Sequence, residues 1–438
     1  MSGIAELLLR IGYRVSGSDI KSSDITRRLE VLGGTIYEGH AAGQAAGADI
    51  VVTSNAIGKE NLEVLAAKQD LIPVIHRAEM LAELMRFKYG IAISGAHGKT
   101  STTSIVASIL DEGGFDPTVV IGGKLKSVGH NAVLGQGDFI VAEADESDGS
   151  FLKMSPSIAV VTNIDMEHLD FYKDMDDIKD SFARFIDGMP FYGLAVLCFD
   201  NPHVRELIPK IKKRFITYGM TPGADLKVEN ISFDGMRTRF DVSYYGQDMG
   251  NIELNLSGAH NALNAAAAIV VGLELEMPFD RIASSLKNQK GVARRLEIKG
   301  ETSGATVLDD YAHHPTEIET TLNAVRESFP RQRKIVLFQP HRHTRTQALF
   351  HDFASVFHQA DVLYVLPVYS AGEEAIPGVN SEKLCEAIRS LGHGRVVYVE
   401  SLEEAADLMK KEARKGDVIL TLGAGDVWKA GELCICDD

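Results

Sequence analysis

Short apolar runs rich in β-branched residues alternate with amphipathic helical segments along most of the chain. Apolar runs of this length, bounded by glycine or polar residues, are typical of buried strands, and their alternation with helices predicts parallel α/β sheets. We therefore predict an α/β protein. The expected strands include residues 13–18, 48–54, 89–94, 139–142, 158–162, 335–338, 362–366, 396–399 and 418–422.

This pattern divides the chain into three predicted domains, residues 1–87, 88–291 and 292–438. The first begins with a helix at residues 4–11 and continues with pieces of a Rossmann-like βαβ fold. The second adds a stretch at residues 225–256 in which apolar and polar residues alternate around Asp-Gly and Tyr-Gly turns, which indicates a small antiparallel sheet. The third is again Rossmann-like.

The composition, with 45% hydrophobic and 24% charged residues, is that of a globular protein. A formal net charge of −16 argues against nucleic-acid binding, so any anionic ligand must be held by local basic groups and backbone N–H groups. No apolar run approaches the ~18 residues of a membrane span, and no signal peptide is recognised. The four cysteines, with Cys434 and Cys436 read as free thiols, fit a reducing cytoplasm.

One glycine-rich loop gives the strongest chemical signal. The run Gly95-Ala96-His97-Gly98-Lys99-Thr100-Ser101 lies between a predicted strand and a predicted helix, which is the context of a phosphate-binding P-loop. Glycines let the backbone wrap a phosphate, Lys99 can reach the β- and γ-phosphates, and Thr100 can offer its hydroxyl to Mg²⁺. The general pattern has glycine at the position of Ile93, so a plain strand–turn–helix is the alternative.

Acidic and histidine-containing stretches follow the next two predicted strands. Glu143 begins the sequence Glu-Ala-Asp-Glu-Ser-Asp, and carboxylates at a strand end beside a P-loop are placed to bind Mg²⁺. The alternative for Glu143 is a solvated acidic loop. His168 clusters with Asn163 and Asp165, which favours a metal or phosphate role over that of a surface histidine.

His260, Asn261 and Asn264 precede an Ala-rich helix and fall within one helical turn. They could present amides to an adenine edge or cap the helix, and their spacing does not separate the two possibilities.

The third predicted domain has two dense polar stretches, residues 309–317 and 339–345. Each follows an apolar run, so the two could lie at one edge of the same sheet. Arg342 and Arg345 would lie on one face if helical, where they can clamp a carboxylate or phosphate, with surface charge as the alternative. Residues 423–426, Gly-Ala-Gly-Asp, follow the last strand and could turn backbone N–H groups toward an anion.

Taken together, these stretches resemble the Mur ligase family. The shortened loop at residues 95–103, Gly-Ala-His-Gly-Lys-Thr-Ser-Thr-Thr, is similar to the P-loop of that family, and the other stretches occur in the order of the family over nearly the whole chain. The run His-Arg-His-Thr-Arg, which ends at Arg345, and residues 369–373 favour the member that adds L-alanine to UDP-N-acetylmuramate in peptidoglycan synthesis.

The resemblance implies a cytoplasmic bacterial enzyme with three domains, which bind the UDP-sugar, bind ATP, and close over ATP. It implies ATP and Mg²⁺ (or Mn²⁺) as cofactors, and UDP-N-acetylmuramate and L-alanine as partners. The implied ATP-binding residues are Gly95, Ala96, His97, Gly98, Lys99, Thr100, Ser101, Asn264, Arg295 and Asp310. The implied substrate-binding residues are Asp19, His40, Ser54, Arg77, Tyr311, His313, Arg342 and Arg345. The implied metal ligands are Thr100, Glu143 and His168. The implied catalytic residues are Lys99, His313, Arg342 and Arg345.

The implied reaction activates the muramate carboxylate as an acyl phosphate, which the alanine amine then attacks. One alternative is a ligase that recycles a preformed tripeptide, although Arg342 and Arg345 argue against it. Another is a truncated, non-catalytic nucleotide-binding homologue, against which Lys99, Glu143 and His168 argue.

The beginning of the sequence departs from the family pattern. Members have a strand and a Gly-x-Gly-Gly-x-Gly turn just before the helix that begins here near Met1. That strand is normally central, so we expect its two neighbours to have open edges and the sugar-nucleotide half to lack its glycine loop. We expect that a start codon was assigned too far downstream, with a truncated product as the alternative.

Overall fold

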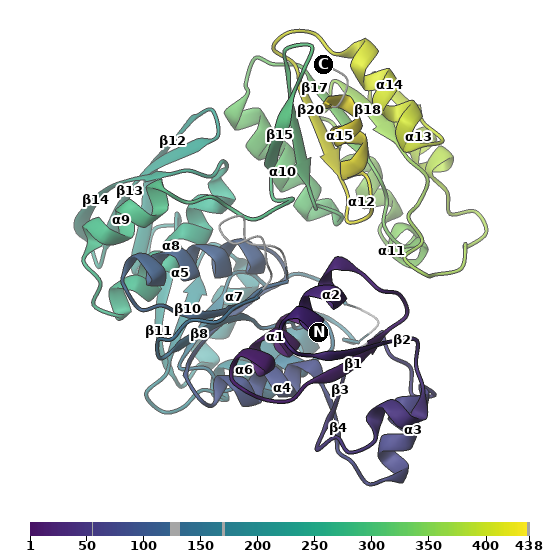
Figure 1. Ribbon diagram of the computed structural model, residues 1–438. Helices are drawn as coiled ribbons and strands as arrows, with labels where there is room; N and C mark the ends of the chain where they lie inside the picture. Colours follow the sequence, from purple (N-terminus) through teal and green to yellow (C-terminus); the bar gives the residue numbers. More distant parts are fainter. Residues whose placement is uncertain (55, 123–131, 169–170, 436–438) are drawn as a thin grey trace. The chain divides into compact units, whose positions relative to one another are not determined.

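The computed structural model describes residues 1–54, 56–122, 132–168 and 171–435 (Figure 1). These residues form two compact units. The first unit contains Met1–Glu229, Asp241–Gly250 and Leu263–Lys287, and the second contains Asn230–Phe240, Asn251–Ala262 and Asn288–Asp438.

A ten-stranded sheet organises the central part of the chain, in the order β14-β13-β12-β11-β10-β9-β5-β8-β6-β7. Its strands are β5 (Tyr89–Ser94), β6 (Thr118–Val120), β7 (Ala132–Val133), β8 (Phe139–Glu143), β9 (Ile158–Val161), β10 (Leu194–Cys198), β11 (Arg214–Gly219), β12 (Leu226–Asp234), β13 (Arg237–Tyr244) and β14 (Gln247–Leu254). The helices among them and after them are α5 (Lys99–Glu112), η2 (Ser150–Lys153), α6 (Met175–Asp187), α7 (Pro202–Leu207), η3 (Ile208–Lys210), α8 (Ala259–Glu274) and α9 (Phe279–Lys287).

Strand β5 occupies the position in this sheet where ligands of α/β proteins bind. It pairs in parallel with β8 on one side and with β9 on the other, so the chain order reverses at β5. A crevice forms at the carboxyl ends of strands at such a switch point. The glycine-rich loop leaves β5 at this edge, and the acidic stretch leaves β8 beside it.

The N-terminal region forms two separate two-stranded sheets. Its elements are α1 (Ser2–Arg10), β1 (Ser16–Asp19), α2 (Asp24–Val31), β2 (Thr35–Glu38), η1 (Ala42–Ala45), β3 (Val51–Thr53), α3 (Leu62–Gln69), β4 (Val74–His76) and α4 (Arg77–Met85). Strand β1 pairs in parallel with β2, and β3 pairs in parallel with β4. Within the described residues these two strand pairs do not join into one sheet.

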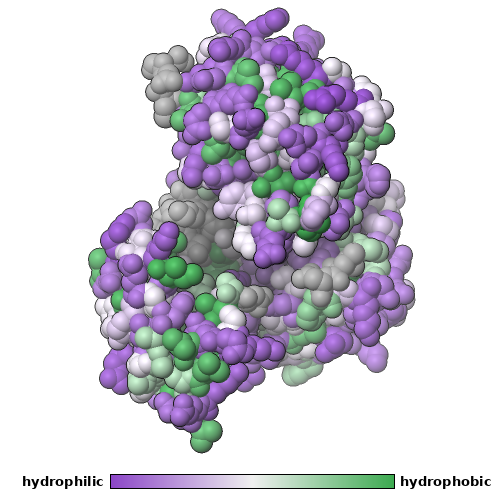
Figure 2. Space-filling model, turned by 90° about the vertical axis from the view of Figure 1, so that its right-hand side faces the viewer, coloured by the Kyte–Doolittle hydropathy of each residue, from purple (hydrophilic) through white to green (hydrophobic). Residues whose placement is uncertain are grey.

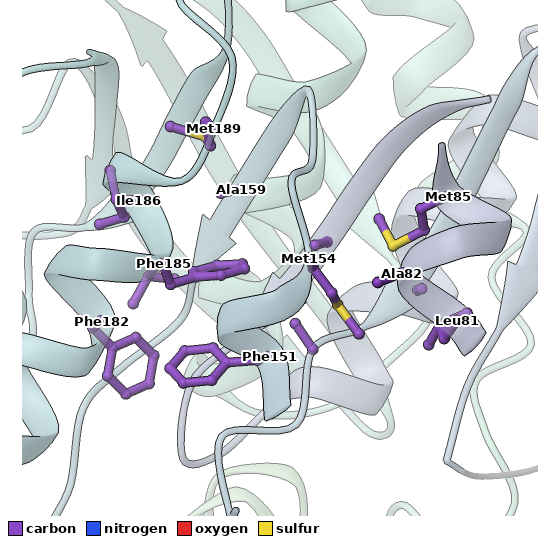
Figure 3. Close-up of a cluster of buried hydrophobic side chains, with 14 of the residues drawn as sticks. Leu81, Ala82, Met85, Phe151, Met154, Ala159, Phe182, Phe185, Ile186 and Met189 are labelled. Carbon is purple, nitrogen blue, oxygen red and sulfur yellow. The ribbon is translucent and has the colours of Figure 1, made fainter. Parts of the chain in front are cut away.

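Helices α1 and α4 share one hydrophobic core with the central sheet. Figure 3 shows Leu81, Ala82 and Met85 of α4 beside Met154, with the Phe151 ring on the other side of Met154. Phe151 stacks on Phe185 of α6 with ring centroids 5.0 Å apart. The amphipathic pattern of α6, which begins at the N-cap Asp174, places its aromatic side chains in this core.

The second unit contains a six-stranded sheet in the order β15-β16-β20-β17-β18-β19, parallel except for β15. Its elements are β15 (Glu297–Thr302), β16 (Ala305–Asp310), α10 (Pro315–Ser328), β17 (Lys334–Phe338), α11 (His343–Ala348), α12 (Phe350–Ser355), β18 (Val362–Val365), α13 (Ser381–Ser390), β19 (Val396–Tyr398), α14 (Leu402–Glu412), β20 (Val418–Leu422) and α15 (Trp428–Ile435). One core lies between the sheet and α10, α12 and α13, and a second lies between the sheet and α14 and α15. The predicted α/β architecture is thus confirmed.

Hydrophilic residues cover most of the face drawn in Figure 2, and apolar residues form only small groups there. Among the residues that the structure describes, no helix has the length and hydropathy to cross a membrane. Cys198, Cys385 and Cys434 are free and buried, whereas Cys436 lies outside the described residues.

Candidate active site

The glycine-rich loop joins β5 to α5 through two glycines in left-handed conformations. Gly95 has φ +132° and Gly98 has φ +81°. A Cβ at Gly95 would collide with the Thr162 hydroxyl, and one at Gly98 would lie 2.8 Å from the Asn264 side-chain oxygen. Both positions therefore require glycine, because the backbone conformation and the available space exclude a side chain.

The end of β9 holds this loop in place. The Asn163 side chain accepts a hydrogen bond from the His97 N–H at 2.8 Å and donates one to the His97 carbonyl at 3.0 Å. The Thr162 hydroxyl donates to the same carbonyl at 2.6 Å. The first intrahelical hydrogen bond of α5 runs from the Thr102 N–H to the Gly98 carbonyl. The N–H groups of Lys99, Thr100 and Ser101 come before this bond, at the helix N-terminus, where such groups can bind an anion.

Lys99 forms an ion pair that is largely removed from solvent. Its Nζ lies 2.9 Å and 3.0 Å from the two carboxylate oxygens of Glu146 and donates to the Gly95 carbonyl at 2.6 Å. Burial alone would lower the pKa of Lys99, but Glu146 and Asp145 outweigh it, so the pKa lies above its ordinary value. Burial would likewise raise the pKa of Glu146, but Lys99 and His168 hold it below its ordinary value. Both groups are therefore charged at neutral pH.

Glu146 also belongs to a group of side chains that could hold a cation. One ligand atom each from Glu146, Glu167 and His168 lies within 4.8 Å of the others. The His168 Nε2 is 3.6 Å from Glu146. Burial lowers the pKa of His168, whereas Glu146 raises it by more, so the net shift is upward. Two carboxylates and an imidazole are suitable ligands for a divalent ion.

Glu143, which we predicted from the sequence to be a metal ligand, is not one of the three residues of this group. Its Oε1 accepts a hydrogen bond from the Gly122 N–H at 2.8 Å. It also lines a pocket of ≈ 220 Å³ within the first unit, together with Ser54 and Arg77. His76 and Asp148 contribute to the same pocket, with 3.9 Å between their closest charged atoms. The structure therefore brings Glu143 together with two of the predicted substrate-binding residues.

The other two predicted sugar-binding residues, Asp19 and His40, lie near the end of β1. Asp19 ends that strand and is exposed. The His40 Nδ1 lies 2.9 Å from both the Ser18 hydroxyl and the Glu63 carboxylate. The hydroxyl in turn donates to Glu63 at 2.5 Å. This arrangement fixes the imidazole ring of His40.

Asn264 lies beside the P-loop, as an adenine or nucleotide contact requires. Its side-chain oxygen accepts a hydrogen bond from the Thr102 hydroxyl at 3.1 Å, and Gly98 approaches it closely. The prediction that His260 to Asn264 precede the Ala-rich helix was wrong by one turn, since α8 begins at Ala259. The amide of Asn264 therefore projects from a helix and not from a loop.

In the second unit, a pair of arginines encloses Tyr311. The guanidinium groups of Arg294 and Arg295 lie 5.0 Å and 5.5 Å from the Tyr311 ring centroid. Arg294 also donates to Asp309 at 3.0 Å. Asp310 accepts hydrogen bonds from two backbone N–H groups, at 2.6 Å and 2.8 Å, and burial raises its pKa to about 6. The predicted residues Arg295, Asp310 and Tyr311 thus lie together at the end of β16.

The loop at residues 423–426 presents carbonyl groups to this cluster. The carbonyls of Gly423, Ala424 and Gly425 all accept hydrogen bonds from Arg294. The Gly423 N–H is also used, because it donates to the Asp310 carbonyl at 3.2 Å. The carbonyls of this loop therefore bind an arginine, and the suggestion that its other N–H groups face an anion stays a prediction.

His313 is neutral at physiological pH. Its Nδ1 lies 3.1 Å from the Tyr311 carbonyl, which can only accept, so the ring proton is on Nδ1 and Nε2 is a free electron-pair donor. Burial, supported by Arg345 and opposed by Glu317, lowers the pKa of His313 to about 4. The ring stands edge-on to Tyr311 at 5.4 Å and to His341 at 5.8 Å.

Arg342 and Arg345 do not lie in the same helix, so the condition under which they would share a helix face is not met. Helix α11 begins at His343, and Arg342 precedes it with φ +69°. The Arg342 N–H donates to the Tyr369 carbonyl at 2.8 Å, which turns the backbone out of the helical conformation. Arg345 lies in the helix, with Nη1 3.3 Å from the His341 Nδ1.

The low pKa of His313 predicts a specific pH dependence of stability. Between pH 6.5 and about 4 the unfolded chain binds a proton at His313 and the folded chain does not, so the free energy of unfolding falls as the pH is lowered through this range. Asp310 contributes with the opposite sign, since its folded pKa of about 6 exceeds its ordinary value. Subtracting denaturant-unfolding curves of His313→Asn from those of the wild type cancels the Asp310 contribution. We expect the difference to change by about 1.2 kcal/mol per pH unit between pH 6 and 4.5. A difference that does not vary with pH would contradict the shifted pKa.

The parallel sheet, the glycine loop at its switch point, and the lysine and threonine that begin α5 define a P-loop nucleotide-binding protein. The chain belongs to the Mur ligase family. Three parts match the descriptions "Mur ligase family, catalytic domain" at residues 1–89, "Mur ligase middle domain" at 93–272 and "Mur ligase, glutamate ligase domain" at 294–425. The predicted family is thus confirmed.

The relatives span almost the full length of the chain. A UDP-N-acetylmuramate–L-alanine ligase from Desulfatibacillum aliphaticivorans is 61% identical over 99% of this chain and 95% of its own length. One from Geobacter sulfurreducens is 54% identical over 99% and 94%. The solved structure of a UDP-N-acetylmuramate-alanine ligase from Thermotoga maritima, 27% identical, superposes with a TM-score of 0.84 over 99% of this chain and 95% of its own.

Sequence reasoning missed Glu146, Glu167 and Arg294. Glu146 and Glu167 lie within the acidic stretches that it singled out, but spacing did not distinguish them from their neighbours. Arg294 adjoins the predicted Arg295, and its left-handed backbone, with φ +60°, has no sequence signal. Only the folded chain shows that Glu146 pairs with Lys99 and that Arg294 binds the loop after β20.

Proposed function

We propose that this chain joins L-alanine to the carboxylate of UDP-N-acetylmuramate, with ATP converted to ADP and phosphate. The full-length similarity to ligases of that name carries the proposal. The P-loop supports it, because glycines, a lysine and a threonine at the start of a helix are the groups that bind the phosphates and metal ion of a nucleotide. We also propose three domains, residues 1–87, 88–291 and 292–438, and a bacterial cytoplasmic location, where ATP and nucleotide sugars are available.

ATP binding is assigned to the loop at residues 95–101, with Asn264 beside it. The N–H groups of the first turn of α5 and the Lys99 ammonium group would surround the phosphates. Lys99 already lies in a pocket of carbonyls and a carboxylate, so it is held in position before a nucleotide arrives. Arg295 and Asp310, at the end of β16, are assigned to the nucleotide from the second unit.

A divalent cation, Mg²⁺ or Mn²⁺, fits the donor set of the first unit. Glu146, Glu167 and His168 offer two carboxylates and an imidazole within 4.8 Å, and we assign Thr100 and Glu143 to the same role beside the phosphates. When bound, such an ion supplies positive charge that offsets the charge of the transferring phosphoryl group.

Activation of the carboxylate is the chemical reason for using ATP. A carboxylate does not react with an amine in water, because oxide is a very poor leaving group. Phosphorylation by the γ-phosphoryl group gives an acyl phosphate, from which the amine displaces phosphate through a tetrahedral intermediate. Lys99 would stabilise charge during phosphoryl transfer.

The residues at the carboxyl edge of the second sheet are assigned to the amino acid. Arg342 and Arg345 would bind its carboxylate, since guanidinium groups match that ion in charge and shape. The neutral His313 has a free Nε2 that can accept a hydrogen bond from the amine, and Tyr311 stands beside it. The pocket lined by Ser54, Arg77 and Glu143, together with Asp19 and His40, is assigned to the UDP-sugar.

Phosphate release in the presence of each candidate acceptor tests this proposal. We expect release of phosphate from ATP only when UDP-N-acetylmuramate and L-alanine are both present. A preformed tripeptide in place of alanine should give little release. A preference for the tripeptide would assign the chain to peptide recycling. Phosphate release that needs neither UDP-N-acetylmuramate nor an amine substrate would contradict ligation.

A further inference from the structure

The turn that carries Arg342 and Arg345 is attached to the loop after β18 by a short ladder of contacts. His341 and Tyr369 form an isolated parallel β-bridge. The Tyr369 N–H donates to the Pro340 carbonyl at 2.8 Å, and the Tyr369 carbonyl accepts from the Arg342 N–H at 2.8 Å. The imidazole and phenol rings stack with centroids 5.6 Å apart and planes 9° apart.

These contacts hold Arg342 in an unfavourable backbone conformation. A φ of +69° at a residue with a Cβ persists only where surrounding contacts enforce it, and such residues concentrate at functional sites. Glu373, from the same loop as Tyr369, fixes the other side of the turn. It accepts hydrogen bonds from the Thr344 N–H at 3.1 Å and from the Thr344 hydroxyl at 2.8 Å.

His341 positions the second arginine directly. The Arg345 guanidinium can only donate, so the His341 Nδ1, 3.3 Å from Nη1, must be the acceptor and the ring proton must be on Nε2. Burial, together with Arg345 and Arg342 and against Glu373, lowers the pKa of His341 to about 4. The ring therefore remains a neutral acceptor at physiological pH.

Packing alone does not account for the ring pair. Tyr369 retains 40% of its surface accessible, so it contributes little to the core of the second unit. Its backbone instead bonds to Pro340 and to Arg342 itself, and its ring stacks on His341. This placement indicates a role in orienting the turn.

We propose that His341 and Tyr369 form a clamp of two positioning residues that presents Arg342 and Arg345 to the carboxylate of the incoming amino acid. This inference rests on the proposed function. The clamp sets the direction of Arg342 through the backbone and that of Arg345 through the imidazole Nδ1. It therefore determines the affinity for the amino acid without contacting the nucleotide.

Steady-state kinetics of clamp variants test the proposal. His341→Phe keeps a ring for stacking and removes the acceptor of Arg345. We expect the KM for L-alanine to rise by about 10- to 100-fold, the usual worth of a hydrogen bond to a charged group, with kcat and the KM for ATP changed less than about threefold. His341→Asn, whose side-chain oxygen can replace Nδ1, should recover most of the affinity.

Two further variants complete the test. Tyr369→Ala removes the stacking ring from a half-exposed position and should raise the KM for alanine in the same selective way. His351→Phe, at an exposed histidine that also neighbours a phenylalanine ring, is the matched control and should leave all constants unchanged.

If the wild type is active but His341→Phe and Tyr369→Ala each leave the KM for alanine within about twofold of the wild-type value, the clamp is overturned while the proposed function stands. Equal increases for alanine and ATP would also overturn it, because they would indicate a general structural effect. A wild type without alanine-dependent phosphate release would overturn the proposed function, and the clamp with it.

Discussion

Lys99→Met is expected to lower kcat/KM for ligation by roughly 10³-fold, because it removes the ammonium group of the P-loop from the transferring phosphoryl group. The substitution also leaves the buried Glu146 carboxylate without its ammonium partner, which should cost about 3 to 5 kcal/mol of stability. Initial rates of phosphate release and denaturant unfolding measure the two effects separately.

The double variant Lys99→Met/Glu146→Gln separates loss of chemistry from loss of fold. It removes both charges of the pair, so most of the stability should return while ligation remains lost. Lys179→Ala is the matched control, since its acidic partners, Asp176 on α6 and Glu206 on α7, are exposed and these ion pairs should contribute little. Near-normal turnover of Lys99→Met would contradict the assignment of the P-loop.

Gly95→Ala is expected to lower nucleotide affinity by more than about 100-fold and the free energy of unfolding by about 3 kcal/mol. The new Cβ would occupy the space of the Thr162 hydroxyl and approach the Asn163 backbone to 2.9 Å, in a backbone conformation that alanine rarely adopts. The loop would have to shift away from β9, which holds it. Calorimetric titration with ATP and denaturant unfolding measure the two effects.

Gly43→Ala provides the matched control for this variant. Its Cβ would meet nothing within 4 Å, and its φ is not in the left-handed region. We therefore expect stability within about 0.5 kcal/mol of the wild type and unchanged nucleotide affinity. Wild-type affinity in Gly95→Ala would show that the loop does not surround a phosphate.

Strands buried on both faces were the elements most accurately predicted from sequence. The prediction for residues 89–94 coincides with β5, and that for 418–422 coincides with β20. Both are mostly apolar runs followed directly by glycine, which is the pattern of central parallel strands. The first strands were predicted too long, at 13–18 and 48–54, because partly exposed strands such as β1 and β3 lack that sharp boundary.

The arrangement of charged groups could not be predicted in the same way. Lys99 and Glu146 are separated by 47 residues along the chain, and only the packing of β5 against β8 brings them together. The left-handed backbone at Arg342 depends on the Tyr369 carbonyl, a contact from another loop. Local patterns identify residue types and spacing, whereas these features arise from long-range contacts between elements.

The origin of one oxygen atom in the released phosphate tests the central claim most directly. UDP-N-acetylmuramate labelled with ¹⁸O in its carboxylate would be incubated with ATP and L-alanine, and the released phosphate analysed by mass spectrometry. An acyl phosphate transfers one carboxylate oxygen to phosphate when the amine displaces it, so we predict one ¹⁸O atom per phosphate and one in the amide product. Unlabelled phosphate, or phosphate release that does not depend on both UDP-N-acetylmuramate and L-alanine, would contradict ligation through carboxylate activation.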